Sequence, residues 1–442
     1  MFGTSGVRGR VGETVTAELA LSIGRAVATD GASAVLLGRD ARETGRFLAD
    51  AVAAGLAECG ADVIDLGRVA TPTLARSIDR LGADAGVVVT ASHNPAPDNG
   101  LKLWTPSGQA FDTERRERIT DLIETDAYAF ADWDASGGRQ RDSTATAAHE
   151  SALIAAADAD PIADLEVVVD IGNGVGGVTA DALGELGADV TTLNAQPDGS
   201  FPGRPSEPTA ETLTALCGQV ESGDADLGIA HDGDADRMLA VDETGTFVPK
   251  DVLLALFARR AVEEAGGGQV AVPVDTSRCV DDAVAAAGGE VVHTKVGDVF
   301  VAEAAAEPGA VFGGEPSGAW IWPDETLCPD GPLAACRLAA LAGSRGPLSE
   351  LVEGVDTYPL ARDNIDVDNK AAVMKRVAEG VRADFERVDT TDGVRVDTDD
   401  GWVLIRASGT QPLVRVTAEA GTEATAERLR ELAADRVTDA TA

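Results

Sequence analysis

Short apolar segments alternate with helical patterns along most of this chain, and that order leaves few folds open. Residues Ser33–Leu37 form an apolar run, Arg46–Glu58 has a helical pattern, and Ala85–Thr90 is an apolar run of the kind found inside sheets. Strands that alternate with helices predict βαβ units. Such units build a mostly parallel sheet that has helices on both faces.

The alternation restarts twice, and the last part of the chain departs from it. Polar segments at Ala131–Ser143 and near Thr246–Asp251 separate the blocks, and the order after Tyr358 is typical of a small unit with an antiparallel sheet. We therefore predict an α/β fold class, with three α/β domains of mixed sheet (α/β/α) followed by a smaller α+β C-terminal domain. The predicted domains are residues 1–145, 146–247, 248–356 and 357–442.

The charge of the chain excludes one broad class of partner. The 442 residues include 75 acidic and 36 basic side chains, and only five of the basic ones are lysine. The net charge is −39. Such a surface repels polyanions, so we expect no nucleic-acid partner. We predict adaptation to high salt, and an acidic protein of an ordinary cytosol is the alternative.

The N-terminus has no apolar signal core, no apolar run is long enough for a membrane helix, and the five cysteines form no CxxC pair. The chain is therefore expected to be cytoplasmic, with reduced thiols.

A serine follows one of the apolar runs directly, in the turn-rich segment Thr90-Ala-Ser-His-Asn-Pro95. In an open α/β sheet, ligands bind beyond the carboxyl ends of the strands. The hydroxyl of Ser92 could therefore act as a nucleophile or carry a phosphoryl group, or it could only cap the loop. No G-x-S-x-G motif surrounds it, which argues against a hydrolase triad.

Three aspartates occupy alternate positions of one tight turn, Asp232-Gly-Asp-Ala-Asp-Arg237. Carboxylates this close repel one another without a cation, and hard oxygen ligands suit Mg²⁺ or Ca²⁺. An EF-hand calcium loop is disfavoured, because Arg237 stands where that loop needs glycine and the flanking segments are strand-like. A Mg²⁺ site that acts on phosphate is the better prediction, since Mg²⁺ leaves room for phosphate oxygens. A solvated acidic turn is the alternative.

Two further loops offer groups that suit a sugar phosphate. The segment Gly313-Gly-Glu-Pro-Ser-Gly318 combines flexible backbone with Glu315 and Ser317, which could bind sugar hydroxyls. The segment Arg406-Ala-Ser-Gly-Thr410, with Arg415 nearby, offers guanidinium, hydroxyl and amide groups for a phosphate. Either loop alone could equally be an ordinary surface turn.

The segment Gly172-Asn-Gly-Val-Gly-Gly177 fits the pattern G-x-G-x-x-G after a strand. A nicotinamide site would need an acidic residue at the end of the next strand. That strand, Ala188–Leu193, ends instead at Asn194. We therefore interpret the segment as a strand-to-helix turn and not as a dehydrogenase fingerprint.

Taken together and in this order, these segments resemble the α-D-phosphohexomutase family. The segments Phe2-Gly-Thr-Ser-Gly-Val-Arg8-Gly and Gly38-Arg-Asp40-Ala-Arg42 are similar to the first two motifs of that family. TASHNP resembles its phosphoserine loop, DGDADR its metal loop, GGEPSG its sugar loop and RASGTQP its phosphate loop. The resemblance covers the whole chain, and it implies four domains.

The resemblance also implies a mechanism. Phosphorylated Ser92 would transfer its phosphate to a hexose monophosphate. The bisphosphate formed would reorient in the site and return its other phosphate to Ser92. It implies Mg²⁺, a phosphoserine and a hexose 1,6-bisphosphate activator. The implied catalytic residues are Ser92, Lys102 (acid or base, with a lowered pKa), Arg8, His93 (positioning the loop) and Arg237; the implied metal ligands are Ser92, Asp232, Asp234 and Asp236; the implied substrate-binding residues are Glu315, Ser317, Arg406, Ser408, Gly409, Thr410 and Arg415.

Only a few residues indicate which hexose phosphate is the substrate. Ser317 and Lys295-Val-Gly-Asp298 resemble phosphoglucosamine mutases, which predicts interconversion of glucosamine 6-phosphate and glucosamine 1-phosphate. Ala319 stands where the family usually has histidine, and Gln411 where it has glutamate. Phosphomannomutase or phosphoglucomutase is therefore the alternative. A noncatalytic sugar-phosphate sensor is an alternative of another class, although a sensor needs neither a nucleophile nor a metal. The expected partner is a small sugar phosphate, with no membrane, and the protein is expected to be a monomer or homodimer.

Overall fold

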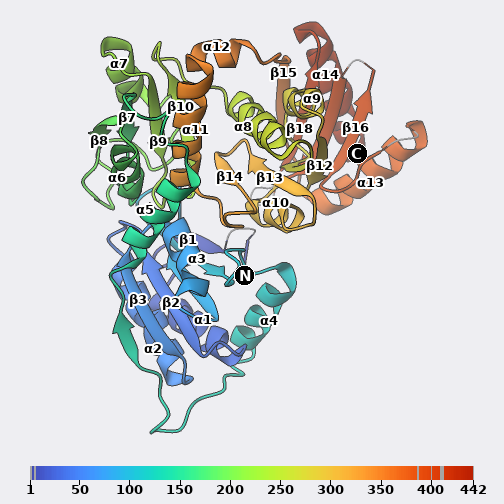
Figure 1. Cartoon of the computed structure of the whole chain (residues 1–442). Helices are drawn as coiled ribbons and strands as arrows, with labels where there is room; N and C mark the ends of the chain where they lie inside the picture. Colours follow the sequence, from blue (N-terminus) through green and yellow to red (C-terminus); the bar gives the residue numbers. More distant parts are fainter. Residues whose placement is uncertain (1, 4–5, 386–387, 400, 409–412, 442) are drawn as a thin grey trace.

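The strands of the chain form four sheets with helices packed against them (Figure 1). The structure is a computed structural model that describes residues 2–3, 6–385, 388–399, 401–408 and 413–441. In Figure 1 the N-terminal unit lies below the other three. Mixed sheets in the first three units and an antiparallel sheet in the last confirm the predicted fold class.

The first sheet has six strands in the order β1-β5-β4-β2-β3-β6. All neighbours run parallel except β5, which is antiparallel to both β1 and β4. Helices cover both faces, since α1, α2 and α4 share one core with the sheet and α3 packs on the other face. The strands are β1 (Val7–Arg10), β2 (Ala34–Arg39), β3 (Asp62–Arg68), β4 (Ala85–Val89), β5 (Asp98–Trp104) and β6 (Arg139–Arg141), and the helices are α1 (Ala17–Thr29), α2 (Gly45–Glu58), α3 (Thr71–Arg80) and α4 (Thr113–Glu124).

The polar segment Ala131–Ser143, expected to be a linker, contains a strand. Strand β6 pairs in parallel with β3 and forms the edge of the first sheet. Its sequence, Arg-Gln-Arg, is exposed throughout. An edge strand of three polar residues has no apolar periodicity, so the sequence pattern did not indicate it.

The second and third units share one hydrophobic core. Residues from β7, β9, α8 and α11 all belong to it, which makes the two units one packed body. Their sheets have the orders β10-β9-β7-β8 and β12-β11-β13-β14. The elements are α5 (Ala145–Ala156), β7 (Glu166–Asp170), α6 (Gly177–Glu185), β8 (Asp189–Leu193), α7 (Thr214–Ser222), β9 (Leu227–His231), β10 (Met238–Asp242), α8 (Lys250–Ala265), β11 (Gln269–Pro273), α9 (Arg278–Ala286), β12 (Glu290–Thr294), α10 (Asp298–Ala305), β13 (Ala310–Glu315), β14 (Ala319–Ile321), α11 (Gly331–Arg345) and α12 (Leu348–Glu353).

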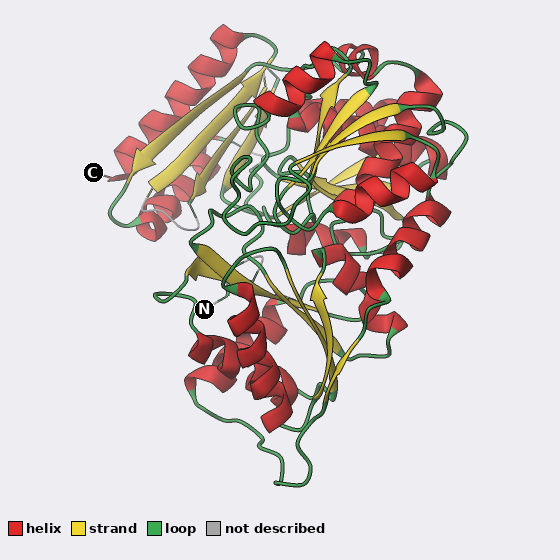
Figure 2. Ribbon diagram, turned by 90° about the vertical axis from the view of Figure 1, so that its left-hand side faces the viewer, coloured by secondary structure: helices red, strands yellow, loops and turns green. Residues whose placement is uncertain are grey.

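The last unit is a four-stranded antiparallel sheet in the order β15-β18-β17-β16, with two helices on one side (Figure 2). Figure 2 also shows that loops fill the middle of the molecule, where the units meet. Within the described residues, no helix is long and apolar enough to cross a membrane. The elements are β15 (Leu360–Asp366), α13 (Lys370–Asp384), β16 (Val394–Thr398), β17 (Gly401–Ala407), β18 (Leu413–Ala420) and α14 (Glu423–Thr441).

Candidate active site

Ser92 lies just beyond β4 and is fully buried against the loop that carries the three aspartates. Its hydroxyl donates a hydrogen bond of 2.5 Å to Oδ2 of Asp232 and lies 3.5 Å from Oδ1 of Asp236. The backbone of Ser92 has a φ of 52°, in the left-handed region that a residue with a Cβ seldom adopts. The two loops that the sequence singled out therefore meet, and the serine is held in a strained conformation where they meet.

A buried arginine holds the serine loop, residues 92–98, in place. Arg42 is 1% exposed, and its Nε donates to Oδ2 of Asp40 at 3.0 Å. Its two terminal nitrogens donate to backbone carbonyls of the serine loop, which ties four peptide units to one guanidinium. Arg42 ends the motif Gly38-Arg-Asp40-Ala-Arg42, but the sequence alone assigns it no role. The four bonds run to Pro95 O (2.8 Å), Asp98 O (2.9 Å), Ser92 O (2.7 Å) and Asn94 O (2.6 Å).

Replacing Arg42 by lysine tests this clamp. An ammonium cannot make four bonds in one plane, so the serine loop loses its fixed shape. We expect kcat to fall by about 30-fold, a change that misplacing a reacting group can produce. Steady-state kinetics measures this, and Arg25→Lys, which alters a pair with Glu58 on the surface of the same unit, is the control. Equal kinetics for Arg42→Lys and the wild type would contradict the clamp.

The three aspartates form the metal-site candidate that the sequence predicts. Their ligand oxygens lie within 4.8 Å of one another, and all three residues are buried. They sit in the turn between the antiparallel strands β9 and β10 and not between helices, which agrees with the rejection of an EF-hand. Oδ1 of Asp234 is buried and has no hydrogen-bond partner among the described residues. Burial and the charges of Asp234 and Asp236 raise the pKa of Asp232. Three buried carboxylates and an unpaired oxygen are a donor set that fits a hard divalent cation.

Lys102 lies on β5 and reaches across to the aspartates. Its Nζ donates to Oδ2 of Asp234 at 2.8 Å and also to Oδ2 of Asp236. The expected lowering of the pKa of Lys102 is wrong for this arrangement. Burial lowers the pKa of Lys102, but the two carboxylates outweigh burial and raise the pKa above its ordinary value.

His93, which follows Ser92 in the chain, lies near the positive charges of Arg8 and Arg237. His93 Nδ1 lies 3.4 Å from the Ser92 hydroxyl oxygen. Burial, followed by the charges of Arg237 and Arg8, lowers the pKa of His93 to about 2. His93 is therefore neutral at pH 7, which suits a positioning role better than proton transfer. Arg8, on β1, has a buried Nε that bonds to no other described residue.

The sugar-loop candidate is attached directly to the metal loop, residues 232–237. Arg237 pairs with Ala319 as an isolated β-bridge. Gly313, Gly314 and Glu315 were expected in a loop, but they end strand β13, and only the turn before β14 is irregular. Glu315 accepts hydrogen bonds from the backbone N–H of Gly297 at 2.7 Å and from the Ser317 hydroxyl at 3.1 Å.

The phosphate-loop candidate lies in the last unit. Arg406 on β17 and Arg415 on β18 line a cavity of about 470 Å³, together with Arg362 and with Asp275 from the third unit. Ser408 is 2% exposed. Gly409, Thr410 and Gln411 lie outside the described residues. Within the part of the chain that the structure describes, no hydrogen bond or ion pair joins Arg406 or Arg415 to the serine loop or the metal loop.

The G-x-G-x-x-G segment supports the metal loop. It lies between β7 and α6, which confirms the strand-to-helix turn. A Cβ on Gly174 would lie 2.7 Å from the carbonyl oxygen of Gly233, so glycine is needed for this close contact. The N–H of Val175 donates to the same oxygen at 3.3 Å. Sequence alone could exclude a dinucleotide site here, but it could not reveal this contact.

Four family models match the chain in order along its length. Their descriptions are phosphoglucomutase/phosphomannomutase alpha/beta/alpha domain I (residues 1–129), domain II (147–245), domain III (249–358) and C-terminal domain (364–436). The chain belongs to the phosphoglucomutase/phosphomannomutase family. It is therefore an enzyme, an isomerase-class phosphotransferase.

Relatives within the phosphoglucomutase/phosphomannomutase family agree on a more specific name. A probable phosphoglucosamine mutase from Methanopyrus kandleri is 48% identical over 97% of this chain and 96% of its own. One of the same name from Methanothermobacter thermautotrophicus is 46% identical over 98% and 96%. A crystal structure of a family protein from Burkholderia thailandensis superposes with a TM-score of 0.88 at 29% identity, covering 100% of this chain and 98% of its own.

Proposed function

We propose that this phosphohexomutase interconverts glucosamine 6-phosphate and glucosamine 1-phosphate through a phosphoserine at Ser92. The hydrogen bond from the Ser92 hydroxyl to Asp232, inside a buried cluster of three aspartates, carries the proposal. It puts a nucleophilic oxygen beside the only group of buried carboxylates in the described chain that could hold a metal ion. A protein that only binds a sugar phosphate needs neither a nucleophilic hydroxyl nor a metal site beside it.

The charged residues of the reacting centre each have a part in the proposed cycle. Asp232, Asp234 and Asp236, with the phosphate on Ser92, would hold Mg²⁺. Bound Mg²⁺ would neutralise charge on the phosphoryl group in transfer. Lys102 would exchange a proton with the sugar hydroxyl that attacks or leaves. Arg8 and Arg237 would orient the phosphate.

The proposed cycle conserves phosphate. A free hydroxyl oxygen of the sugar monophosphate attacks the phosphorus of the phosphoserine, the bond from phosphorus to Ser92 Oγ breaks, and a 1,6-bisphosphate forms. The bisphosphate then reorients in the site, so that its other phosphate faces Ser92. Ser92 Oγ then attacks its other phosphate, which restores the phosphoserine and releases the isomer. A hexose 1,6-bisphosphate would phosphorylate enzyme that has lost its phosphate. Arg406, Ser408, Gly409, Thr410 and Arg415 would bind the phosphate that is not reacting, and Glu315 and Ser317 the hydroxyls.

Two carboxylates at the sugar loop favour an amino sugar. Glu315 is 8% exposed, and burial together with the negative charge of Asp298 raises its pKa to about 7. The ammonium group of glucosamine would offset this repulsion, whereas the hydroxyl of glucose or mannose would not. The name that the relatives share points to the same sugar.

Replacing Asp298 by asparagine tests the recognition of the ammonium group. We expect kcat/KM for glucosamine 6-phosphate to fall by about 30-fold, because the carboxylate that would attract the ammonium group loses its charge. For glucose and mannose phosphates we expect changes of less than about threefold, since neither carries an ammonium group. Ser317→Ala is the control, and it should affect all three sugars alike. An equal loss for every sugar in Asp298→Asn would remove Asp298 from sugar selection.

Substrate comparison tests the function itself. The purified protein is assayed in molar KCl with Mg²⁺ and a trace of glucose 1,6-bisphosphate. We expect kcat/KM for glucosamine 6-phosphate to exceed that for mannose 6-phosphate and glucose 1-phosphate by about a hundredfold, the discrimination a charge-reading site can supply. Equal or better use of mannose or glucose phosphate would make the enzyme a phosphomannomutase or phosphoglucomutase. No turnover of any sugar by protein with confirmed phosphate on Ser92 would leave a noncatalytic sensor.

A further inference from the structure

Helix α11 begins at a buried charge network that joins three units of the molecule. Asp330 precedes the helix, is fully buried, and caps it by accepting from the N–H of Leu333 at 3.0 Å. Its other oxygen, Oδ2, accepts from Nε of Arg76 on α3 at 2.7 Å and from Nε2 of His149 on α5 at 3.2 Å. Burial alone would raise the pKa of Asp330, but His149 and Arg76 lower it below the ordinary value, so Asp330 stays ionised.

The same network lies directly behind the metal loop. A Cβ on Gly331, the first residue of α11, would lie 2.6 Å from the carbonyl oxygen of Arg237 and 2.8 Å from that of Ala235. The start of α11 thus packs against the backbone of the metal loop with no room for a side chain. Any shift of this helix end therefore moves the backbone that carries the aspartates.

Helix α3 contacts the metal loop from the other side. Thr71 at its start donates twice to Asp234, from the backbone N–H to the carbonyl oxygen at 2.9 Å and from the hydroxyl to Oδ2 at 2.6 Å. Two residues on, the Thr73 hydroxyl bonds to Nδ1 of His149 at 2.8 Å. One helix of the first unit is therefore bonded both to a metal-ligand candidate and to the network around Asp330.

We propose that Asp330, with Arg76 and His149, is a positioning residue that sets the geometry of the metal loop and thereby the affinity for the divalent cation. The network fixes both the start of α11 and the position of α3, and both helices contact residues 232–237. This role rests on the metal site of the proposed function.

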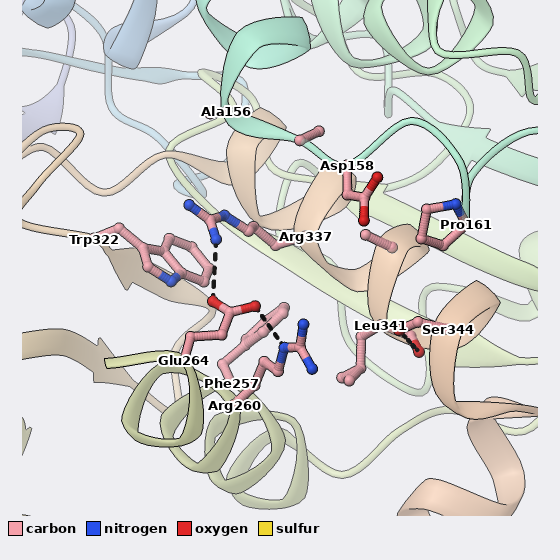
Figure 3. Close-up of a pocket in the computed structure, with 12 residues that line it drawn as sticks. Ala156, Asp158, Pro161, Phe257, Arg260, Glu264, Trp322, Arg337, Leu341 and Ser344 are labelled. Carbon is pink, nitrogen blue, oxygen red and sulfur yellow. Dashed lines mark hydrogen bonds and ion pairs between the residues drawn. The ribbon is translucent and has the colours of Figure 1, made fainter. Parts of the chain in front are cut away.

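The rest of α11 is held by other contacts, so the network is not needed merely to keep the helix in place. Further along the helix, Arg337 donates to Glu264 of α8 at 3.3 Å, and Arg345 pairs with Glu263 at 2.9 Å. Figure 3 shows Glu264 between Arg260 and Arg337. These contacts and the shared core keep α11 on the third unit when the Asp330 pairs are lost.

Asp330→Asn is the decisive variant, because an amide oxygen still caps α11 while the charge that holds Arg76 and His149 disappears. The readout is the Kd of Mn²⁺ for the full-length protein, measured by calorimetry without substrate. We expect this Kd to rise about tenfold, as changes behind a metal ligand commonly cause. Arg76→Gln leaves Asp330 and its cap intact, and we expect a rise in the same direction.

Two control variants separate positioning from general loss of stability. Asp242→Asn removes a 5% exposed carboxylate at the far end of β10, where it accepts three hydrogen bonds within a turn. Glu264→Gln weakens α11 along its length. Both should lower Tm and leave the Kd of Mn²⁺ unchanged.

The outcomes distinguish the positioning role from the function. A Kd in Asp330→Asn and Arg76→Gln equal to that of the wild type would overturn the positioning role and leave the function intact. A rise in Asp242→Asn as large as that in Asp330→Asn would also overturn it. Failure of the wild type to bind Mn²⁺ would overturn the metal site and the positioning role together.

Discussion

Ser92→Ala should lose turnover while keeping its sugar phosphate. We expect kcat to fall by about 10⁴-fold or more, because the oxygen that carries the phosphoryl group is gone and the covalent route is closed. The groups expected to bind the sugar lie on other loops, so Kd for glucosamine 6-phosphate should change by less than about threefold. Stopped-time product analysis and calorimetry measure the two quantities.

The control for Ser92→Ala is a serine away from the site. Ser200→Ala removes an exposed hydroxyl whose one hydrogen bond within the described residues is to Asp198, and its kinetics should equal those of the wild type. Turnover by Ser92→Ala at even a tenth of the wild-type rate would mean that the phosphoryl group does not pass through Ser92. Loss of binding together with turnover would instead make Ser92 a structural residue of the site.

Asp232→Asn should have the next largest effect. Asp232 accepts the hydrogen bond of Ser92 and is one of the three buried carboxylates of the metal loop. An amide in its place removes a negative charge and a preferred Mg²⁺ ligand, so we expect kcat to fall by about a thousandfold at saturating sugar. The Mg²⁺ concentration for half activation should rise as well. Both come from rate measurements over a Mg²⁺ titration.

The comparison for Asp232→Asn is Asp242→Asn, the matched change at the other end of β10. Asp242 bonds within its own turn and lies outside the metal loop. Its variant should keep the wild-type Mg²⁺ dependence even if it is less stable. Unchanged Mg²⁺ dependence in Asp232→Asn would mean that Asp232 is not a metal ligand. It would also contradict the proposal that the metal loop holds Mg²⁺ beside Ser92.

Much of the site could be predicted because its reactive groups follow strands. Ser92 follows the buried strand β4 and the three aspartates follow the buried strand β9, and in open α/β sheets ligands bind beyond such strand ends. The structure places Ser92 in contact with Asp232, as the resemblance implies. The apolar run Ala85–Thr90 likewise predicted a strand, and the structure has β4 there, at Ala85–Val89.

Other features depend on tertiary contacts that no local pattern encodes. Arg42 bonds to carbonyls more than 50 residues further along the chain, and Asp330 joins helices from three units. The direction of the pKa shift of Lys102 follows from which charges surround it, so the sequence could not settle it. Adaptation to high salt stays a prediction from the net charge of −39.

A single turnover of phosphorylated enzyme tests most directly whether Ser92 passes its phosphate to the sugar. The protein is labelled with [³²P]phosphate by a labelled hexose 1,6-bisphosphate, freed of excess reagent, and mixed with unlabelled glucosamine 6-phosphate and Mg²⁺. We expect the label to map to Ser92 alone and to move into glucosamine phosphates at least as fast as kcat. Label that stays on the protein while product forms, or that maps to a residue other than Ser92, would contradict phosphoryl transfer through Ser92.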